Sequence, residues 1–183
     1  MLIAQKTKEN NIAEHLIYMF QIEDLIRANN LDLETIVNTI IGPQISDEKL
    51  LDAYTKWYAG LIKQMKTEGI QKKGHCSDLN EIIMELLMLH NTMLNVLNDK
   101  GYKERFEKAL PALKDFQSKS NSSEINIVEV GLNAMYSKMI LKLKGQEFTA
   151  TTEEAFGHIS QLLGYLAIFY KKMRSGDLNF ANN

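Results

Sequence analysis

The sequence predicts an all-α protein, an antiparallel bundle of about four long helices with shorter helices packed outside. Apolar residues recur at steps of three and four along several windows, which is the spacing of one helix face. The 183 residues include only two prolines and ten glycines, a composition that favours long helices over many turns. We expect residues 1–174 to form a single domain and residues 175–183 to be a disordered tail.

The first long helix is predicted over residues 8–29. Its apolar face is formed by residues at three- and four-residue steps, namely Ile12, Leu16, Met19, Ile22 and Ile26. A short helix follows over residues 33–41, with Asp32 as its N-cap, because a side-chain oxygen there can accept from free backbone N–H groups. The dipeptide Gly42-Pro43 is expected to end this short helix.

The third helix is expected to begin after Ser46 and to end at Gly69. It has the most regular apolar stripe of the chain, formed by Leu50, Tyr54, Trp57, Tyr58, Leu61 and Met65. Residues 70–76 follow as a polar loop.

The fourth helix is predicted to begin with Ser77 or Asp78 as its N-cap and to end near residues 100–101. Glu81 stands three residues after Asp78, which is the spacing of a capping box. The next segment, residues 102–118, is helical by composition. Pro111 should kink or split it, and its dense mixed charges predict a solvated outer hairpin.

Residues 119–123, with the sequence KSNSS, are the best candidate for a linker. Residues 124–144 are apolar around most of the circumference of a helix, which predicts a central position, and Gly145 is expected to end this helix. The last helix is predicted over residues 152–174. Its charged ends complement the helix dipole and contain Glu153 and Glu154 in the first turn and Lys171, Lys172 and Arg174 in the last.

Three segments carry a resemblance to a known family: MLIAQK at the start, QIEDLIRANN at residues 21–30, and ISQLLGYLAIFYKKM at residues 159–173. They resemble an uncharacterised Bacteroidetes family of proteins of about this length, a domain of unknown function. The resemblance runs nearly end to end and implies an all-helical single domain in a bacterial cytoplasm. It brings no activity, ligand or catalytic residue to these positions.

The charge and composition exclude several classes of protein. A net charge of −2 argues against a nucleic-acid binder, whose surface is usually strongly basic. No apolar run approaches the roughly 20 residues that span a bilayer, and the stretch MLIAQKTKENN lacks the apolar core of a signal peptide. The lone cysteine, Cys76, cannot form an internal disulfide. We therefore expect a cytoplasmic protein.

The first helix places three ionisable side chains, His15, Glu23 and Arg27, within its own apolar arc on a wheel of about 100° per residue. Buried groups of this kind need partners. Glu23 and Arg27 stand four residues apart, the spacing of an intrahelical ion pair, and Asp24 lies at the edge. The pair is interpreted as a structural contact between helices. The alternative is a recognition site in which Arg27 presents its planar fork to a carboxylate or phosphate.

A metal site is the second hypothesis. His15, His90 and His158 come from three predicted helices and could converge in a bundle, with Glu23 or Glu129 as an oxygen ligand. Such a set suits Zn, Fe, Mn or Ni and would make a metal-dependent bundle enzyme. The Glu-x-x-His and His-Glu-x-x-His motifs are missing from the sequence, so core histidines without metal are the favoured interpretation and no cofactor is expected.

Two further features concern reactivity and partners. Cys76 follows His75, but neighbouring side chains point apart in regular backbones, so Cys76 is interpreted as a loop thiol without a role. Small residues recur along one side of the last helix, at Gly157, Ser160, Gly164 and Ala167. This seam predicts close approach of another helix, either from the same chain or across the two-fold axis of a homodimer.

These patterns do not predict a set of catalytic residues. The leading prediction is a non-enzymatic binding or protein-interaction module, self-associating or bound to an unknown protein or small molecule. The metal-dependent bundle enzyme is the alternative.

Overall fold

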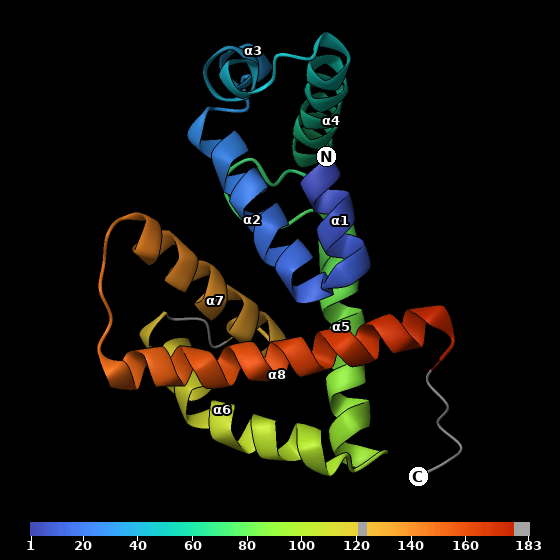
Figure 1. Ribbon diagram of the computed structural model, residues 1–183, viewed down its shortest axis with the longest axis vertical. Helices are drawn as coiled ribbons and strands as arrows, with labels where there is room; N and C mark the ends of the chain where they lie inside the picture. The colour runs from blue at the N-terminus through green and yellow to red at the C-terminus, as the bar shows by residue number, and fades with distance from the viewer. Residues whose placement is uncertain (121–123, 178–183) are drawn as a thin grey trace.

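The computed structural model describes residues 1–120 and 124–177 (Figure 1), and within these residues it is helical and contains no β-strand. The predicted all-α bundle is confirmed. The α-helices are α1 (Leu2–Asn10), α2 (Ile12–Ala28), α3 (Leu33–Ile36), α4 (Glu48–Thr67), α5 (Ser77–Asn95), α6 (Lys100–Lys119), α7 (Ile127–Leu143) and α8 (Ala150–Ser175). A π-helical turn, Val37–Ile41, and a 3-10 turn, Gly42–Gln44, follow α3.

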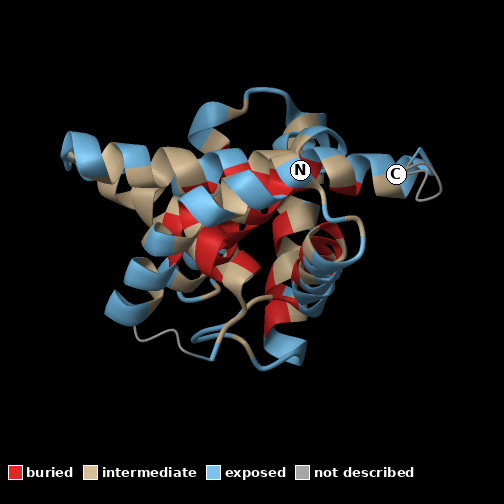
Figure 2. Cartoon of the chain, turned by 90° about the horizontal axis from the view of Figure 1, so that it is seen from below, coloured by how far each residue is buried: buried red, intermediate tan, exposed pale blue. Residues whose placement is uncertain are grey.

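Helix α8 runs across the molecule, between α6 and α7 (Figure 1). It packs against α6 on one side and against α7 and α2 on the other, and it also contacts α5. Buried residues gather where these helices face one another, and the outward sides of the helices are exposed (Figure 2). Within the described residues, no helix combines the length and the apolar character needed to cross a membrane.

The predicted first helix over residues 8–29 is two helices, α1 and α2. The break falls at Asn11, which has extended backbone angles of φ −151° and ψ 103°. Its side-chain oxygen accepts from the backbone N–H groups of Ala13 and Glu14, at 3.1 and 3.3 Å. Asn11 is therefore the N-cap of α2, and the polar run before it forms a separate helix on the same core.

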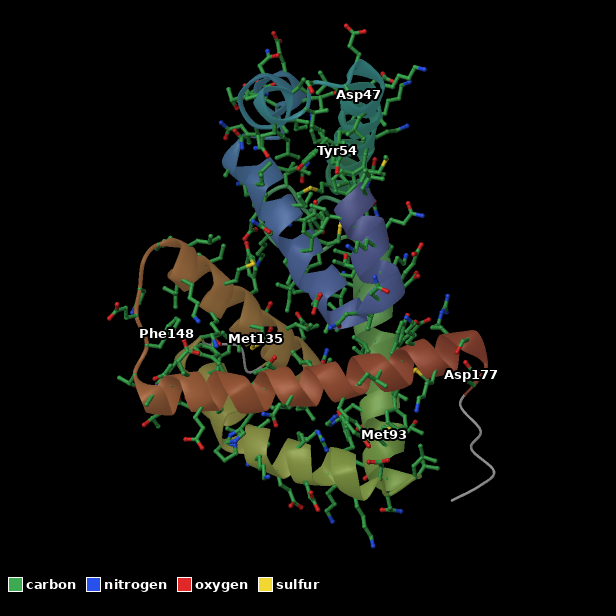
Figure 3. The ribbon with its side chains drawn as sticks, viewed as in Figure 1. Asp47, Tyr54, Met93, Met135, Phe148 and Asp177 are labelled. Carbon is green, nitrogen blue, oxygen red and sulfur yellow. The ribbon has the colours of Figure 1, made fainter. Side chains whose placement is uncertain are left out.

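Several predicted boundaries are confirmed. Asp32 caps α3 by accepting from Glu34 N at 3.0 Å, and the helical segment turns into the 3-10 turn at Gly42. Asp47 caps α4 at Leu50 N, 2.9 Å away (Figure 3). The polar loop over residues 70–76 follows α4, as expected.

Helix α6 was predicted as a solvated outer hairpin, and this prediction is wrong. The helix continues through Pro111, and its side chains Tyr102, Ala109 and Leu113 are fully buried. These three positions are seven and four residues apart, so they form one apolar stripe that packs against α8 and α7. The dense charges lie on the opposite side of the helix.

The last two helices agree with their predicted ranges to within a few residues. Phe148, in the loop between them, stacks edge-on against Phe156 of α8, with ring centroids 5.3 Å apart (Figure 3). Helix α8 extends to Ser175, beyond the predicted boundary at residue 174, and Gly176 ends it with φ 78°. The linker was predicted at residues 119–123, but Lys119 is the last residue of α6 and Ser120 is its C-cap. Residues 121–123 of that linker, and residues 178–183 of the predicted tail at 175–183, lie outside the described residues.

Candidate functional site

Glu23 is the most deeply buried charged residue on α2, with no exposed surface. Its Oε1 accepts from the backbone N–H of Cys76 at 2.8 Å, and its Oε2 accepts from His75 Nδ1 at 2.6 Å. Both partners belong to the loop that leads into α5. The carboxylate therefore ties α2 to the beginning of a helix more than fifty residues away in the sequence.

This contact explains where α5 begins. Neither Ser77 nor Asp78 is the N-cap, contrary to the prediction; the cap residue is Cys76, whose side chain makes no capping hydrogen bond. Instead, carboxylates from elsewhere in the chain accept hydrogen bonds from the free N–H groups at the start of α5. Glu68, at the end of α4, accepts from Ser77 N at 2.7 Å and from Ser77 Oγ at 2.8 Å. Two negative charges at a helix N-terminus also interact favourably with the helix dipole and stabilise the helix.

His75 is held by two side-chain contacts and is partly exposed. Its ring stacks on Phe20 with centroids 3.8 Å apart, its Nδ1 donates to Glu23, and 19% of its side chain is exposed. Burial raises the pKa of the nearby Glu129 carboxyl, and the charge of His75 opposes this shift. The imidazole is thus hydrogen-bonded to a carboxylate of α2, and its charge also acts on the Glu129 carboxyl of α7.

Arg27 pairs with Asp24, at 2.9 Å, and not with Glu23 as predicted. Its Nη2 also donates to the carbonyl oxygens of Ile70, at 3.3 Å, and Gly74. The guanidinium group therefore holds the loop between α4 and α5 against α2. These contacts favour the structural interpretation of Arg27 over the anion-recognition site, because its fork is occupied within the chain.

Asp24 connects this group of contacts to α7. Its Oδ2 accepts from the Tyr136 hydroxyl at 2.7 Å, and burial together with this hydrogen bond raises the pKa of Tyr136. A shallow hollow lies beside the pair and is lined by Asp24, Tyr136, Ser137, Ile140 and Leu141. The Asp24 carboxylate is already bound by a guanidinium and a phenol, so it is engaged in packing α7 onto α2.

Cys76 is buried, and this burial raises the pKa of its thiol, with the hydrogen bond and the charge of Glu23 adding to the shift. A thiol with a raised pKa stays protonated at neutral pH and is a poor nucleophile. The geometry thus favours an unreactive cysteine.

The structure does not bring the predicted metal ligands together. His15 Nδ1 donates to the Ala4 carbonyl at 2.9 Å, His90 Nδ1 lies 2.6 Å from the Tyr102 hydroxyl, and His158 is half-buried on α8. Burial lowers the pKa of both His15 and His90. Among residues 1–120 and 124–177, no three His, Cys, Asp or Glu side chains are grouped so as to hold a metal ion.

The four residues of the predicted small-residue seam lie on one side of α8 but differ in burial. Ala167 is buried in the core, whereas Ser160 is exposed. A Cβ atom built on Gly157 or Gly164 would meet no atom within 4 Å, so no helix of the described chain approaches these two glycines closely. Packing within the chain therefore does not account for them.

The sequence interpretation missed one member of this surface. Ile168 is four residues beyond Gly164, on the same outward side of α8, and 56% of it is exposed. The three- and four-residue spacing that identifies buried faces would also have found this exposed one. We define the outer face of α8 as Glu154, Gly157, Gln161, Gly164, Ile168 and Lys171.

The fold and these contacts define an all-helical protein whose interior ionisable groups join its helices. Over residues 1–177 the sequence matches the family described as a domain of unknown function (DUF4924), and the chain belongs to that family. The expected membership of an uncharacterised family is thus confirmed. No curated protein and no solved structure matches the chain.

Proposed function

We propose that this chain is a non-enzymatic interaction module of a bacterial cytoplasm, and that it self-associates through the outer face of α8. The proposal requires no cofactor. Its partner is a second copy of the chain.

The contacts of the candidate reactive groups support a non-enzymatic role. Glu23 is bound by His75 and a backbone N–H, and Arg27 is bound by Asp24 and loop carbonyls. Cys76 is buried, and its thiol has a raised pKa. The Glu23 and Arg27 side chains each hold α2 to the loop before α5, which is a structural task.

The observation that carries the proposal is the open space over Gly157 and Gly164. A glycine inside a helix costs about 1 kcal/mol relative to alanine, and two of them, each partly exposed, lie on the outer face of α8. No contact within the described residues compensates for this cost, because none of their atoms lies within 4 Å of a Cβ built on either glycine. A second helix that packs closely against α8 from outside would compensate for it.

The exposed side chain of Ile168 supports the same surface. It lies one helical turn from Gly164 and is among the few large apolar side chains of the described residues that are more than half exposed. Burial of such a side chain in an interface contributes about 1.5–3 kcal/mol. An apolar side chain one helical turn from an open glycine position is a feature of a packing surface.

Sedimentation equilibrium of the full chain tests this proposal. We expect a concentration-dependent dimer, which Gly164→Leu converts to a monomer with an unchanged helical circular dichroism spectrum. Gly60→Leu is the matched control, since Gly60 also lies inside a helix, α4, with nothing within 4 Å of an added Cβ. A wild-type chain that stays monomeric at high concentration, or equal behaviour of the two variants, would overturn the proposal.

A further inference from the structure

We infer that two copies of the chain pack their α8 helices antiparallel, about a two-fold axis that passes between Gln161 and Gly164. This inference rests on the proposed self-association and specifies its geometry. It follows from the order of residue types along the outer face of α8.

The positions on this face have the spacing of a helix-pairing seam. From Glu154 to Lys171 the steps are 3, 4, 3, 4 and 3 residues, which keep all six positions within an arc of about 100°. The seam extends over about 26 Å at a rise of 1.5 Å per residue. This order of steps is the same when read in either direction, so the face can meet its own reversed copy in register.

Reversal brings large side chains opposite gaps. Gly157 comes to face the partner's Ile168, and Gln161 comes to face the partner's Gly164. The Ile168 side chain is exposed, and the space above Gly157 is open, so the side chain of one copy fits the gap of the other. The two-fold axis repeats each contact, as in any isologous interface.

The same register brings opposite charges together at both ends of the seam. Glu154 faces the partner's Lys171, and Lys171 faces the partner's Glu154. Within the described part of the chain neither side chain forms an ion pair, whereas the neighbouring Glu153 binds Lys138 at 2.6 Å. Lys172, next to Lys171, lies over the Phe169 ring at 5.2 Å. Among the charged side chains of α8 in the described residues, Glu154 and Lys171 are thus the two with neither an ion pair nor a ring contact.

A parallel arrangement of the two α8 helices would place like residues opposite each other. Each residue would face its own copy, so that glutamate meets glutamate, lysine meets lysine, and the glycine gaps face one another unfilled. Like charges in direct opposition disfavour an interface, and unfilled space forfeits packing contacts. The residue order therefore selects the antiparallel pair.

Charge reversal on the full chain tests the register. Glu154→Lys and Lys171→Glu should each raise the dimer dissociation constant about tenfold or more, because each creates two like-charge contacts. An equimolar mixture of the two variants should form a heterodimer of near wild-type affinity, since both contacts are again between opposite charges. Glu104→Lys, at an exposed site on α6, makes the same charge change elsewhere and should leave the dimer intact.

The outcomes separate the two proposals. A monomeric wild-type chain overturns both of them. A dimer that Gly164→Leu dissociates, but that neither charge reversal weakens, keeps the self-association and overturns the antiparallel register. Weakening by both single variants without recovery in the mixture also overturns the register. Recovery in the mixture, with helical content and melting temperature unchanged, supports it.

Discussion

Replacing Glu23 tests whether the buried carboxylate holds the start of α5. Glu23→Ala leaves the buried N–H of Cys76 without its acceptor, which costs about 1–3 kcal/mol. It also removes packed side-chain atoms, at about 0.8 kcal/mol per methylene. Because His75 is partly exposed, water can replace its lost bond. We therefore expect the free energy of unfolding, measured by urea titration, to fall by about 3 kcal/mol.

Two further variants make this prediction specific. Glu23→Gln retains an oxygen for the Cys76 N–H and should cost only about 1 kcal/mol. Glu107→Ala removes an exposed carboxylate from the middle of α6 and should change stability by less than about 0.5 kcal/mol. If Glu23→Ala cost no more than Glu107→Ala, the Glu23 carboxylate would not hold the helix start. If Glu23→Gln cost as much as Glu23→Ala, charge would matter more than the acceptor role.

Three other predictions follow from the same contacts. Arg27→Lys should lower the free energy of unfolding by about 1–2 kcal/mol, because one ammonium group cannot hydrogen-bond to Asp24 and to the loop carbonyls together. An unchanged urea midpoint would contradict this prediction. His15 and His90 have folded-state pKa values lowered below 6.5, so the unfolded chain binds protons first. Stability should be full above about pH 6.5 and should fall as the pH drops toward the folded-state pKa values. His90→Gln should flatten that fall, and an unaltered pH profile would exclude His90 as a cause. Cys76 should resist a thiol-specific reagent in the native protein and react after unfolding; rapid labelling of the folded chain would show that the thiol is accessible.

Periodicity predicted most helices because each of them buries one face. The apolar stripe of α4 and the dipole-complementing ends of α8 are local features, and the structure places both helices close to the predicted ranges. The break at Asn11 was missed although the sequence contains a signal for it. Asn11 directly precedes the apolar spacing, and Glu14 stands three residues later, which is the pattern of a helix N-terminus. The outer position predicted for α6 was wrong because the segment contains many charged residues and only three fully buried side chains, which form a weak apolar pattern.

The candidate site was harder to predict because its partners are distant in the sequence. The i, i+4 spacing predicted an ion pair between Glu23 and Arg27. In the structure Arg27 pairs with Asp24, and Glu23 pairs with His75. A single sequence contains no signal that links Glu23 to a loop more than fifty residues away. Burial of Glu23 and His15 could be predicted from the helix wheel, and both are buried; the identity of their partners could not.

The start of α5 has a consequence for how the chain acquires its structure. Its first N–H groups are bound by Glu23 and Glu68, which belong to two other helices. An α5 segment by itself would lack both acceptors, and its first turn would fray. The beginning of this helix is therefore a product of helix association, and the order of the first turn of α5 is coupled thermodynamically to the docking of α2 and α4.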